Sequence, residues 1–409
     1  MMNSSPGNRP ASQGRRRRWL TRNIVAIALL SLFSDMSHEM VTAILPFFVI
    51  SIGGTAVALG LIEGVSDLIA SVAKIGSSYY SDRIGRRKPI LIAGYALTAA
   101  KGVMAFATTV PAVLVIRTFA WLGRGMRSPV RDALLAESVV PEYTGRAFGL
   151  HRAADTAGAI LGPASALGLL LLAVSYRNIF LASLIPGVAT LFIVLFVVQD
   201  RAGLMGHGKT LMQSLQALPG GFRRFVAAAG VFGLGNFGHT LLILRAQELL
   251  APAWGTARAD AWALGLYVWL NVVYAAGAYP AGVWSERLGK RRILGFGYFL
   301  FALMCLGFLV VGRGIPGLAV LFALGGLYVA FVDAMEGALA ADLLPPEVYG
   351  TGYGVLGAVN GLGDLLSSII VGFLWVRVSV ASGFIYALVL TGLGATLLLT
   401  LVRDDRVGE

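Results

Sequence analysis

Apolar windows of about 20 residues recur along almost the whole chain of 409 residues, separated by short polar segments. A window of that length can cross the roughly 30 Å hydrocarbon core of a bilayer as an α-helix. Only 13% of the residues are charged, whereas soluble proteins contain about a quarter. The windows lack the two-residue alternation of membrane strands, so helices are the structure that satisfies their backbone in lipid. The sequence therefore predicts an all-α integral membrane protein.

The chain contains twelve predicted transmembrane helices. They cover residues 23–52, 56–80, 89–109, 111–137, 147–173, 178–199, 223–249, 260–284, 293–312, 315–343, 348–375 and 380–402. When the N-terminus is placed inside the cell, the basic residues of the connecting segments gather on the cytoplasmic side. Both termini are therefore predicted to be cytoplasmic, in a multi-pass protein of the inner (plasma) membrane. This clustering attributes the net charge of +12 to topology rather than to nucleic-acid binding.

The polar residues 1–22 contain no acid and precede the first apolar segment. No small-residue cleavage site follows that segment, so we predict an uncleaved first span behind a cytoplasmic tail. An organelle transit peptide is the alternative. The single cysteine, Cys305, excludes a disulfide within the chain, and we expect no cofactor.

Two charged segments of the first half return in the second half. The octet S-D-R-I-G-R-R-K at 81–88 reappears as S-E-R-L-G-K-R-R at 285–292, and the segment 133–149 is repeated at 338–354. The two shifts, 204 and 205 residues, agree, which indicates two pseudo-symmetric six-helix bundles. The predicted units are a tail at 1–22, a bundle at 23–199, a cytoplasmic linker at 200–222, a second bundle at 223–402 and a tail at 403–409. A short surface helix at 210–218 is the alternative to a plain linker.

Twelve spans, the repeat of six helices and the D-R-x-G-R-R-K loop between the second and third spans resemble the major facilitator superfamily over nearly the whole chain. The loop pattern of this family is G-x-x-x-D-R-x-G-R-R, and Ser78 replaces its leading glycine in the first half. The matching residues are Asp82, Arg83, Gly85, Arg86 and Arg87 and, in the second half, Gly282, Glu286, Arg287, Gly289, Lys290 and Arg291. The resemblance implies that these loops gate the cytoplasmic face, and a purely topological role is the alternative.

The resemblance extends to the fourth and fifth spans. Arg117 resembles the arginine of the family's fourth helix, although Trp121 follows where the family has glutamine. The fifth span matches part of the antiporter pattern G-x-x-x-G-P-x-x-G-G through Gly158, Gly162 and Pro163. These matches imply alternating access and hint at export by antiport.

Charged residues inside the predicted spans need a function, because each costs about 3 kcal/mol or more in hydrocarbon. Asp35, His38 and Glu39 share one face of the first span, since they lie three and four residues apart. This face could bind a coupling proton, because a carboxylate in a medium of low dielectric constant can titrate near neutral pH. It could instead bind a transition-metal ion. The third possibility is a structural ion-pair network, with the basic partners Lys74, Lys101 or Arg117.

The candidate residues of a central proton or substrate cavity come from both halves. The predicted set is Asp35, His38, Glu39, Glu63, Asp67, Lys101, Arg117, Arg124, Asn236, His239, Asn271, Asp333, Glu336, Asn360 and Asp364, with no resident metal. Arg117 and Arg124 either bind an anionic group of the substrate or neutralise the acids of the second span. Arg127 and Arg131, nearer the cytoplasm, are predicted to snorkel. Arg152 and Asp155, with His151, are assigned to the gate or loop network, and binding of the solute is the alternative.

These features predict a monomeric secondary active transporter that moves a small solute by alternating access. We expect coupling to protons, because the chain has no G-x-x-x-x-G-K-[ST] loop for ATP. The partners are then a small-molecule substrate, protons and the lipid bilayer. Alternatives with the same fold are a uniporter and a metal-ion or siderophore exporter, and a non-transporting receptor is the alternative outside it. No nucleophile motif indicates an enzyme.

Overall fold

The computed structural model describes residues 20–84, 86–139, 144–200, 218–344 and 349–402. In those ranges the regular elements are helices, without a strand. In the first half they are α1 (Arg22–Ser51), α2 (Ala56–Ile84), α3 (Lys88–Ala99), η1 (Ala100–Phe106), α4 (Val110–Glu137), α5 (Thr144–Leu171), α6 (Tyr176–Ala182), α7 (Leu184–Phe192) and η3 (Ile193–Val197). In the second half they are α9 (Gly220–Gly233), α10 (His239–Trp254), α11 (Thr256–Leu288), α12 (Lys290–Val310), α13 (Ile315–Leu343), α14 (Tyr349–Arg377) and α15 (Val380–Leu401).

The helices follow the predicted spans closely, and the predicted fold class is confirmed. Within the described residues, ten helices or helix pairs are long and apolar enough to cross a membrane. The remaining two predicted spans differ from these for physical reasons. The helix α4 contains Arg117, Arg124, Arg127 and Arg131, which lower its hydropathy. The seventh span is divided between α9 and α10.

The break in the seventh span lies at residues 234–238, between α9 and α10. Its exposed backbone groups find partners on α14: the N–H of Gly238 donates to Ser368 Oγ (3.1 Å), and the carbonyl of Asn236 accepts from Ser367 Oγ (2.6 Å). A helix interrupted in this way is stable in a membrane only where protein surrounds it. The sequence analysis treated the segment as one helix, and the structure places its break against the centre of the molecule.

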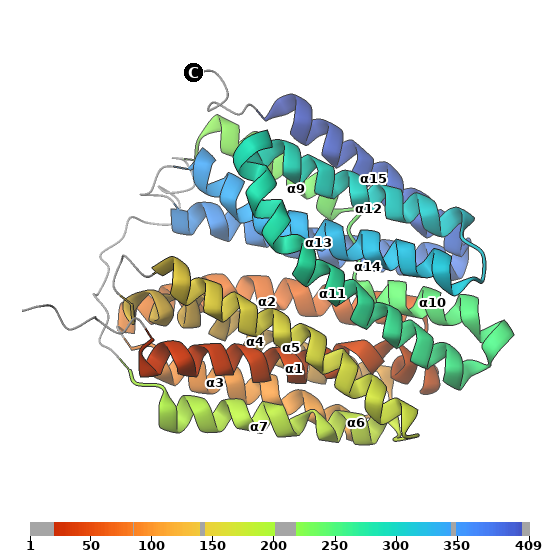
Figure 1. Cartoon of the computed structure of the whole chain (residues 1–409), viewed down its shortest axis with the longest axis horizontal. Coiled ribbons are helices and arrows are strands. Elements are labelled where there is room, and N and C mark those ends of the chain that lie inside the picture. The colour runs from red at the N-terminus through yellow and green to blue at the C-terminus, as the bar shows by residue number, and fades with distance from the viewer. Residues whose placement is uncertain (1–19, 85, 140–143, 201–217, 345–348, 403–409) are drawn as a thin grey trace, which may run out of the picture.

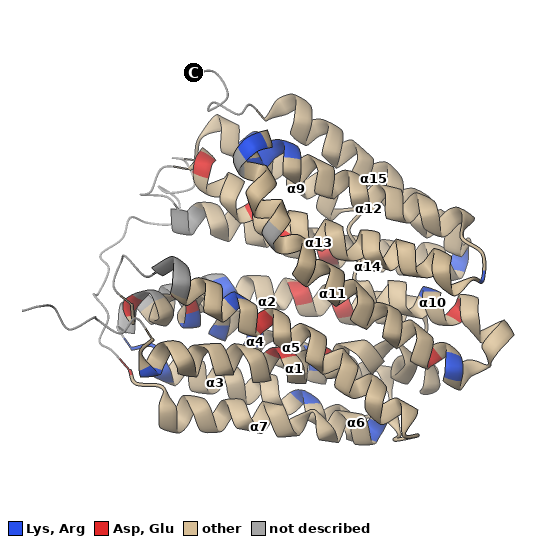
Figure 2. Ribbon diagram, in the orientation of Figure 1, with Lys and Arg blue, Asp and Glu red and all other residues tan. Residues whose placement is uncertain are grey.

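The two halves form two bundles that lie side by side (Figure 1). In the first bundle α1 packs on α5, and α2 on α4; in the second, α11 packs on α13, and α12 on α13 and α15. The halves meet where α2 packs on α14 and where α5 packs on α11. Charged residues lie along α2, α4 and α5, whereas α7 and α15 contain none (Figure 2).

Glycines bring the backbones of α2 and α14 into direct contact. A Cβ atom added at Gly60 would lie 2.1 Å from the carbonyl oxygen of Ser368, and one at Gly372 would lie 2.6 Å from the carbonyl oxygen of Ala56. Farther along the two helices, a Cβ atom at Gly76 or Gly357 would meet nothing within 4 Å. The halves therefore touch along one part of this seam and separate toward the end at which the described chain begins and ends (Figure 1).

Candidate functional site

A cavity of about 280 Å³ lies between the two halves. Helices α1, α2, α4 and α5 form one side, and α10, α11 and α13 form the other. The predicted residues that line it are Asp35, His38, Glu39, Glu63, Asp67, Arg117, Arg124, His239, Asn271 and Asp333. Further lining residues are Thr42, Trp121, Arg152, Asp155, Thr156, Thr240, Tyr267 and Tyr274. The cavity is therefore largely polar, although it lies at the centre of a helical membrane protein.

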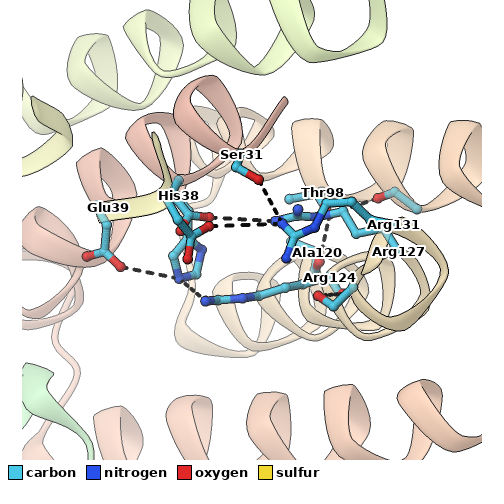
Figure 3. Close-up of polar contacts among 12 residues, drawn as sticks. Ser31, His38, Glu39, Thr98, Ala120, Arg124, Arg127 and Arg131 are labelled. Carbon is cyan, nitrogen blue, oxygen red and sulfur yellow. Dashed lines mark hydrogen bonds and ion pairs between the residues drawn. The ribbon is translucent and has the colours of Figure 1, made fainter. Parts of the chain in front are cut away.

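The predicted polar face of α1 points into this cavity (Figure 3). His38 Nε2 accepts a hydrogen bond from Arg124 and lies 3.7 Å from Glu39 Oε1. Glu39 Oε2 accepts a hydrogen bond of 2.8 Å from the hydroxyl of Tyr267. Because Tyr267 belongs to α11, this contact joins the two halves across the cavity.

Three arginines of α4 reach acids or a hydroxyl of neighbouring helices. Arg117, with 0% of its surface exposed, donates from Nη2 to both carboxylate oxygens of Glu63, at 2.6 and 2.8 Å. Arg127 Nη2 lies 3.9 Å from Asp35 Oδ1. The prediction that Arg127 and Arg131 snorkel is wrong, because their exposed fractions are 1% and 8%. The packing of α4 against α2 and α3 buries both side chains, and Arg131 Nη1 donates to Ser31 Oγ (3.2 Å).

Trp121 is a wall of the cavity and links several of its charged groups. The guanidinium carbon of Arg117 lies 3.9 Å from the centre of the indole ring. The indole N–H donates to Asp67 Oδ1 at 2.8 Å, and the ring of His38 is 4.4 Å away. Sequence reasoning did not assign Trp121 to the site, because an aromatic residue in a membrane helix has no charge or spacing that distinguishes a cavity wall from a lipid-facing anchor.

Two carboxyl groups from α1 and α5 face the cavity together. Asp35 of α1 and Asp155 of α5 both line it, where the two helices approach each other closely. Two glycines of α5 allow this approach: a Cβ atom at Gly158 would lie 2.4 Å from the carbonyl oxygen of Leu32, and one at Gly162 would lie 2.6 Å from that of Met36. The predicted helix-five motif therefore permits close packing of α5 on α1, and α5 continues through Pro163.

Arg152 and Asp155, which the sequence analysis assigned to the gate, both line the cavity. Arg152 Nη1 lies 3.4 Å from Asp155 Oδ2. Their neighbour His151 points elsewhere: its Nδ1 hydrogen bonds with Ser31 Oγ (2.7 Å), and its Nε2 lies 3.6 Å from Asp132 Oδ1. The first turns of α5 thus contribute to the cavity wall itself.

Five residues of the predicted cavity set do not line it: Lys101, Asn236, Glu336, Asn360 and Asp364. Asn236 and His239 both contact the hydroxyl of Tyr328, at 3.1 Å each. Asn360 donates to Glu336 Oε2 (2.9 Å). Lys101 is 1% exposed, and its amine has no hydrogen-bond partner among the described residues.

Among the described residues, the predicted gating loops contribute an ion pair to each half. Arg87 donates to Glu137 Oε1 (2.9 Å), and Lys290 Nζ lies 2.8 Å from Asp342 Oδ2. Each pair joins a loop residue to the end of α4 or of its counterpart α13. Arg291 donates to the carbonyl of Val402, the residue that follows α15.

Other gating residues are exposed or lie outside the described part. Arg86 and Arg287 are exposed, and Gly289 adopts φ = 86°, a conformation that favours glycine between α11 and α12. Gly85 and the side chains of Asp82, Arg83 and Glu286 lie outside the described residues.

The described residues show no set of metal ligands that would support the metal hypothesis for the α1 face. Among the residues that the structure describes, no group of three or more His, Cys, Asp or Glu side chains is arranged to hold a metal ion. The ion-pair hypothesis named Lys74, Lys101 or Arg117 as partners, whereas the contacts described above come from Arg124, Arg127 and Tyr267.

Comparison with known proteins identifies the family. The sequence profile of the Major Facilitator Superfamily matches residues 27–248 and 224–409. The chain belongs to the Major Facilitator Superfamily. Among its relatives, an uncharacterized MFS-type transporter of Methanocaldococcus jannaschii is 32% identical over 384 residues, which cover 93% of this chain and 95% of that protein.

Two further comparisons agree. The multidrug resistance protein MdtH of Cronobacter sakazakii is 28% identical over 330 residues, or 77% of each chain. The crystal structure of a peptide transporter, POT, in complex with sulfate superposes with a TM-score of 0.76 at 14% identity, covering 95% of both chains, which shows the same fold. Membership of the Major Facilitator Superfamily makes this protein a multi-pass membrane transporter.

Proposed function

We propose that this transporter is a proton-coupled secondary carrier that works by alternating access and exchanges its solute for protons. The observation that supports this proposal most directly is the presence of Asp35 and Asp155 together in the wall of the central cavity, each beside an arginine of α4. Two carboxylates that face one enclosed cavity repel each other, and a proton on Asp35 relieves that repulsion. We therefore assign Asp35 as the residue that binds and releases the coupling proton.

Arginines beside Asp35 and Asp155 make the packing of the helices depend on that proton. Arg127 Nη2 lies 3.9 Å from Asp35, and Arg131 Nη1 lies 4.0 Å from Asp155. Arg124 and Arg152 face the same carboxyl groups. Loss of the proton leaves two adjacent negative charges, which repel each other and attract these arginines. Protonation then changes the attraction among α1, α4 and α5, the helices that form this side of the cavity.

Alternating access is supported by the way the halves contact each other. At the end away from the described termini, Tyr176 donates to Asp260 across the interface, and near the cavity Tyr267 donates to Glu39. The seam between α2 and α14 separates toward the other end, as Gly76 and Gly357 show. The cavity is thus positioned to be reached from one side of the membrane at a time, and the predicted topology makes that side cytoplasmic.

Flux through the purified protein in liposomes tests the proposal. A panel of candidate solutes is screened for accumulation driven by a pH gradient. We expect Asp35→Asn to reduce that accumulation by at least tenfold while exchange of labelled for unlabelled solute persists, because the amide keeps the shape of the carboxyl group but cannot exchange its proton. The same result is expected for Asp155→Asn.

The matched control is Asp132→Asn, since the Asp132 carboxylate contacts Arg131 (3.2 Å) but does not line the cavity. This variant should retain gradient-driven accumulation. Wild-type accumulation by both Asp35→Asn and Asp155→Asn would contradict proton coupling through this pair. Flux that ignores the pH gradient altogether would identify a uniporter.

A further inference from the structure

The acids and bases of the cavity wall differ in their partners. Within the described residues, the wall contains six carboxylates and three guanidinium groups, so acids are in excess. Two of the guanidinium groups have carboxylate partners in the wall itself: Arg117 pairs with Glu63, and Arg152 with Asp155. Arg124 donates to the imidazole of His38. The guanidinium groups of the wall are therefore largely paired with side chains of the protein itself.

Three of the carboxylates are held instead by neutral aromatic donors. These three aromatic–carboxylate pairs are Tyr267 Oη to Glu39 Oε2 at 2.8 Å, Trp121 Nε1 to Asp67 Oδ1 at 2.8 Å, and Tyr274 Oη to Asp333 Oδ2 at 3.2 Å. A hydrogen bond from a phenol or an indole positions a carboxylate but does not itself supply a positive charge. In the described part of the chain, neither Asp67 nor Asp333 forms an ion pair. The pairs come from both halves, so they surround the cavity.

The aromatic members of these pairs are themselves suited to a cation. The face of an aromatic ring attracts positive charge, and the attraction grows when water is excluded. The wall already shows this interaction, since the Arg117 guanidinium lies 3.9 Å from the centre of the Trp121 ring. A cation between the two halves would meet carboxylate oxygens and aromatic rings together.

We propose that the solute bound in this cavity is a small organic cation, such as a quaternary or protonated amine, and that the three aromatic–carboxylate pairs recognise its charge. The inference rests on the proposed transport function of the same cavity. An independent feature of the wall also indicates a ligand: the Thr42 hydroxyl is 8% exposed, lines the cavity and has no hydrogen-bond partner among the described residues. A buried hydroxyl without a partner is costly unless a ligand or water satisfies it.

Three small molecules of nearly equal shape test the charge preference. Choline is the cation, 3,3-dimethylbutan-1-ol replaces its nitrogen with carbon and is neutral, and 3,3-dimethylbutanoate is the corresponding anion. Their binding to the purified full-length protein is measured by titration calorimetry without any gradient. We expect choline to bind at least about tenfold more tightly than the neutral alcohol, because only its charge differs. Equal binding, preference for the anion or no binding of choline would overturn the inference.

Variants of the pairs then locate the preference. Glu39→Gln, Asp67→Asn and Asp333→Asn should each weaken choline binding about tenfold and leave binding of the neutral alcohol unchanged, because each keeps the size of the side chain and removes its charge. The matched control is Glu248→Gln. Glu248 lies outside the cavity, where it accepts a hydrogen bond from the indole of Trp375 (3.3 Å) and also pairs with Arg245 (3.5 Å). Equal losses of choline binding in this control and in the three variants would assign the effect to folding instead of recognition.

The outcome is separable from that of the transport proposal. Charge-selective binding without proton-driven flux would contradict proton coupling and leave the cation inference intact. Proton-driven flux of a neutral or anionic solute, with no preference for choline over its isosteres, would do the reverse.

Discussion

The interiors of the two halves differ in chemistry although one repeats the helices of the other. In the first half, Arg117, Arg127 and Lys101 are fully buried. In the second half, aromatic rings pack between α9 and α12: the rings of Phe232 and Tyr298 stack at 3.7 Å between centroids, and Phe301 meets Phe232 edge to face at 6.0 Å.

Alignment of the two repeated halves identifies positions at which their chemistry differs. A shift of 204 residues aligns Lys101 with Cys305, Glu63 with Tyr267 and Asp67 with Asn271. Three charged positions of the first half thus have neutral counterparts at equivalent places in the second. The six-helix unit needs helical packing at these positions but not charge. On the proposed function, the charge of the first half serves the solute and the proton rather than the fold.

Removal of one partner from the buried Arg117–Glu63 pair should have the largest effect on stability. Arg117→Met leaves the Glu63 carboxylate buried without its guanidinium partner, which we expect to cost about 3–5 kcal/mol of unfolding free energy. The double variant Arg117→Met with Glu63→Met should recover most of that loss. Reversible unfolding of the purified protein in detergent is the measurement.

The counterpart of Arg117 at a shift of 205 residues is Phe322, which is 1% exposed. Phe322→Met is the matched control and should cost about 1 kcal/mol, because it alters packing without isolating a charge. Equal stability of the single and double variants at Arg117 and Glu63 would show that the ionic interior is not held together by this pair.

Introduction of a charge into the aromatic half should have the next largest effect. Cys305 is fully buried in the apolar core, so Cys305→Lys is expected to cost about 3 kcal/mol. The reciprocal change Lys101→Met should preserve or slightly raise stability, since the Lys101 amine has no hydrogen-bond partner in the described structure. Thermal unfolding of both variants checks the asymmetry. Comparable destabilisation by the two changes would remove the contrast between the halves.

The gating ion pairs are the ionic feature that the halves share, and we expect the smallest effects there. Glu137 and Asp342 have side-chain exposures of 30% and 20%, so solvent screens their attraction to Arg87 and Lys290. Glu137→Gln and Asp342→Asn should each cost about 1 kcal/mol or less, measured by the same unfolding assay. A loss several times greater at one gate than at the other would show that the gates are not equivalent.

The sequence predicted the fold almost completely, because span length and hydropathy depend on the residues alone. It missed the break at residues 234–238, where the free backbone groups are satisfied by serines of α14 more than 120 residues away. Periodicity along one segment contains no information about such a distant partner.

Helical spacing predicted which side chains share a face, whereas it could not predict their contacts with other helices. Helical spacing placed Asp35, His38 and Glu39 together, because i, i+3 and i+4 share a face. It could not indicate that Tyr267 of α11 would meet Glu39, since that contact depends on how the two bundles are oriented. Lys101 shows the converse: its depth in the third span was predicted, but its side chain lies behind the cavity wall.

At Gly60 and Gly372, the seam between α2 and α14 places main chain against main chain. Two helices that touch through main-chain atoms can tilt relative to each other without a change of side-chain rotamers at the contact. On the proposed mechanism, this glycine contact is the pivot, and the ends of the two bundles move around it. The carboxylates of the cavity wall beside this pivot would then face one aqueous compartment and afterwards the other, and they would not have to cross lipid.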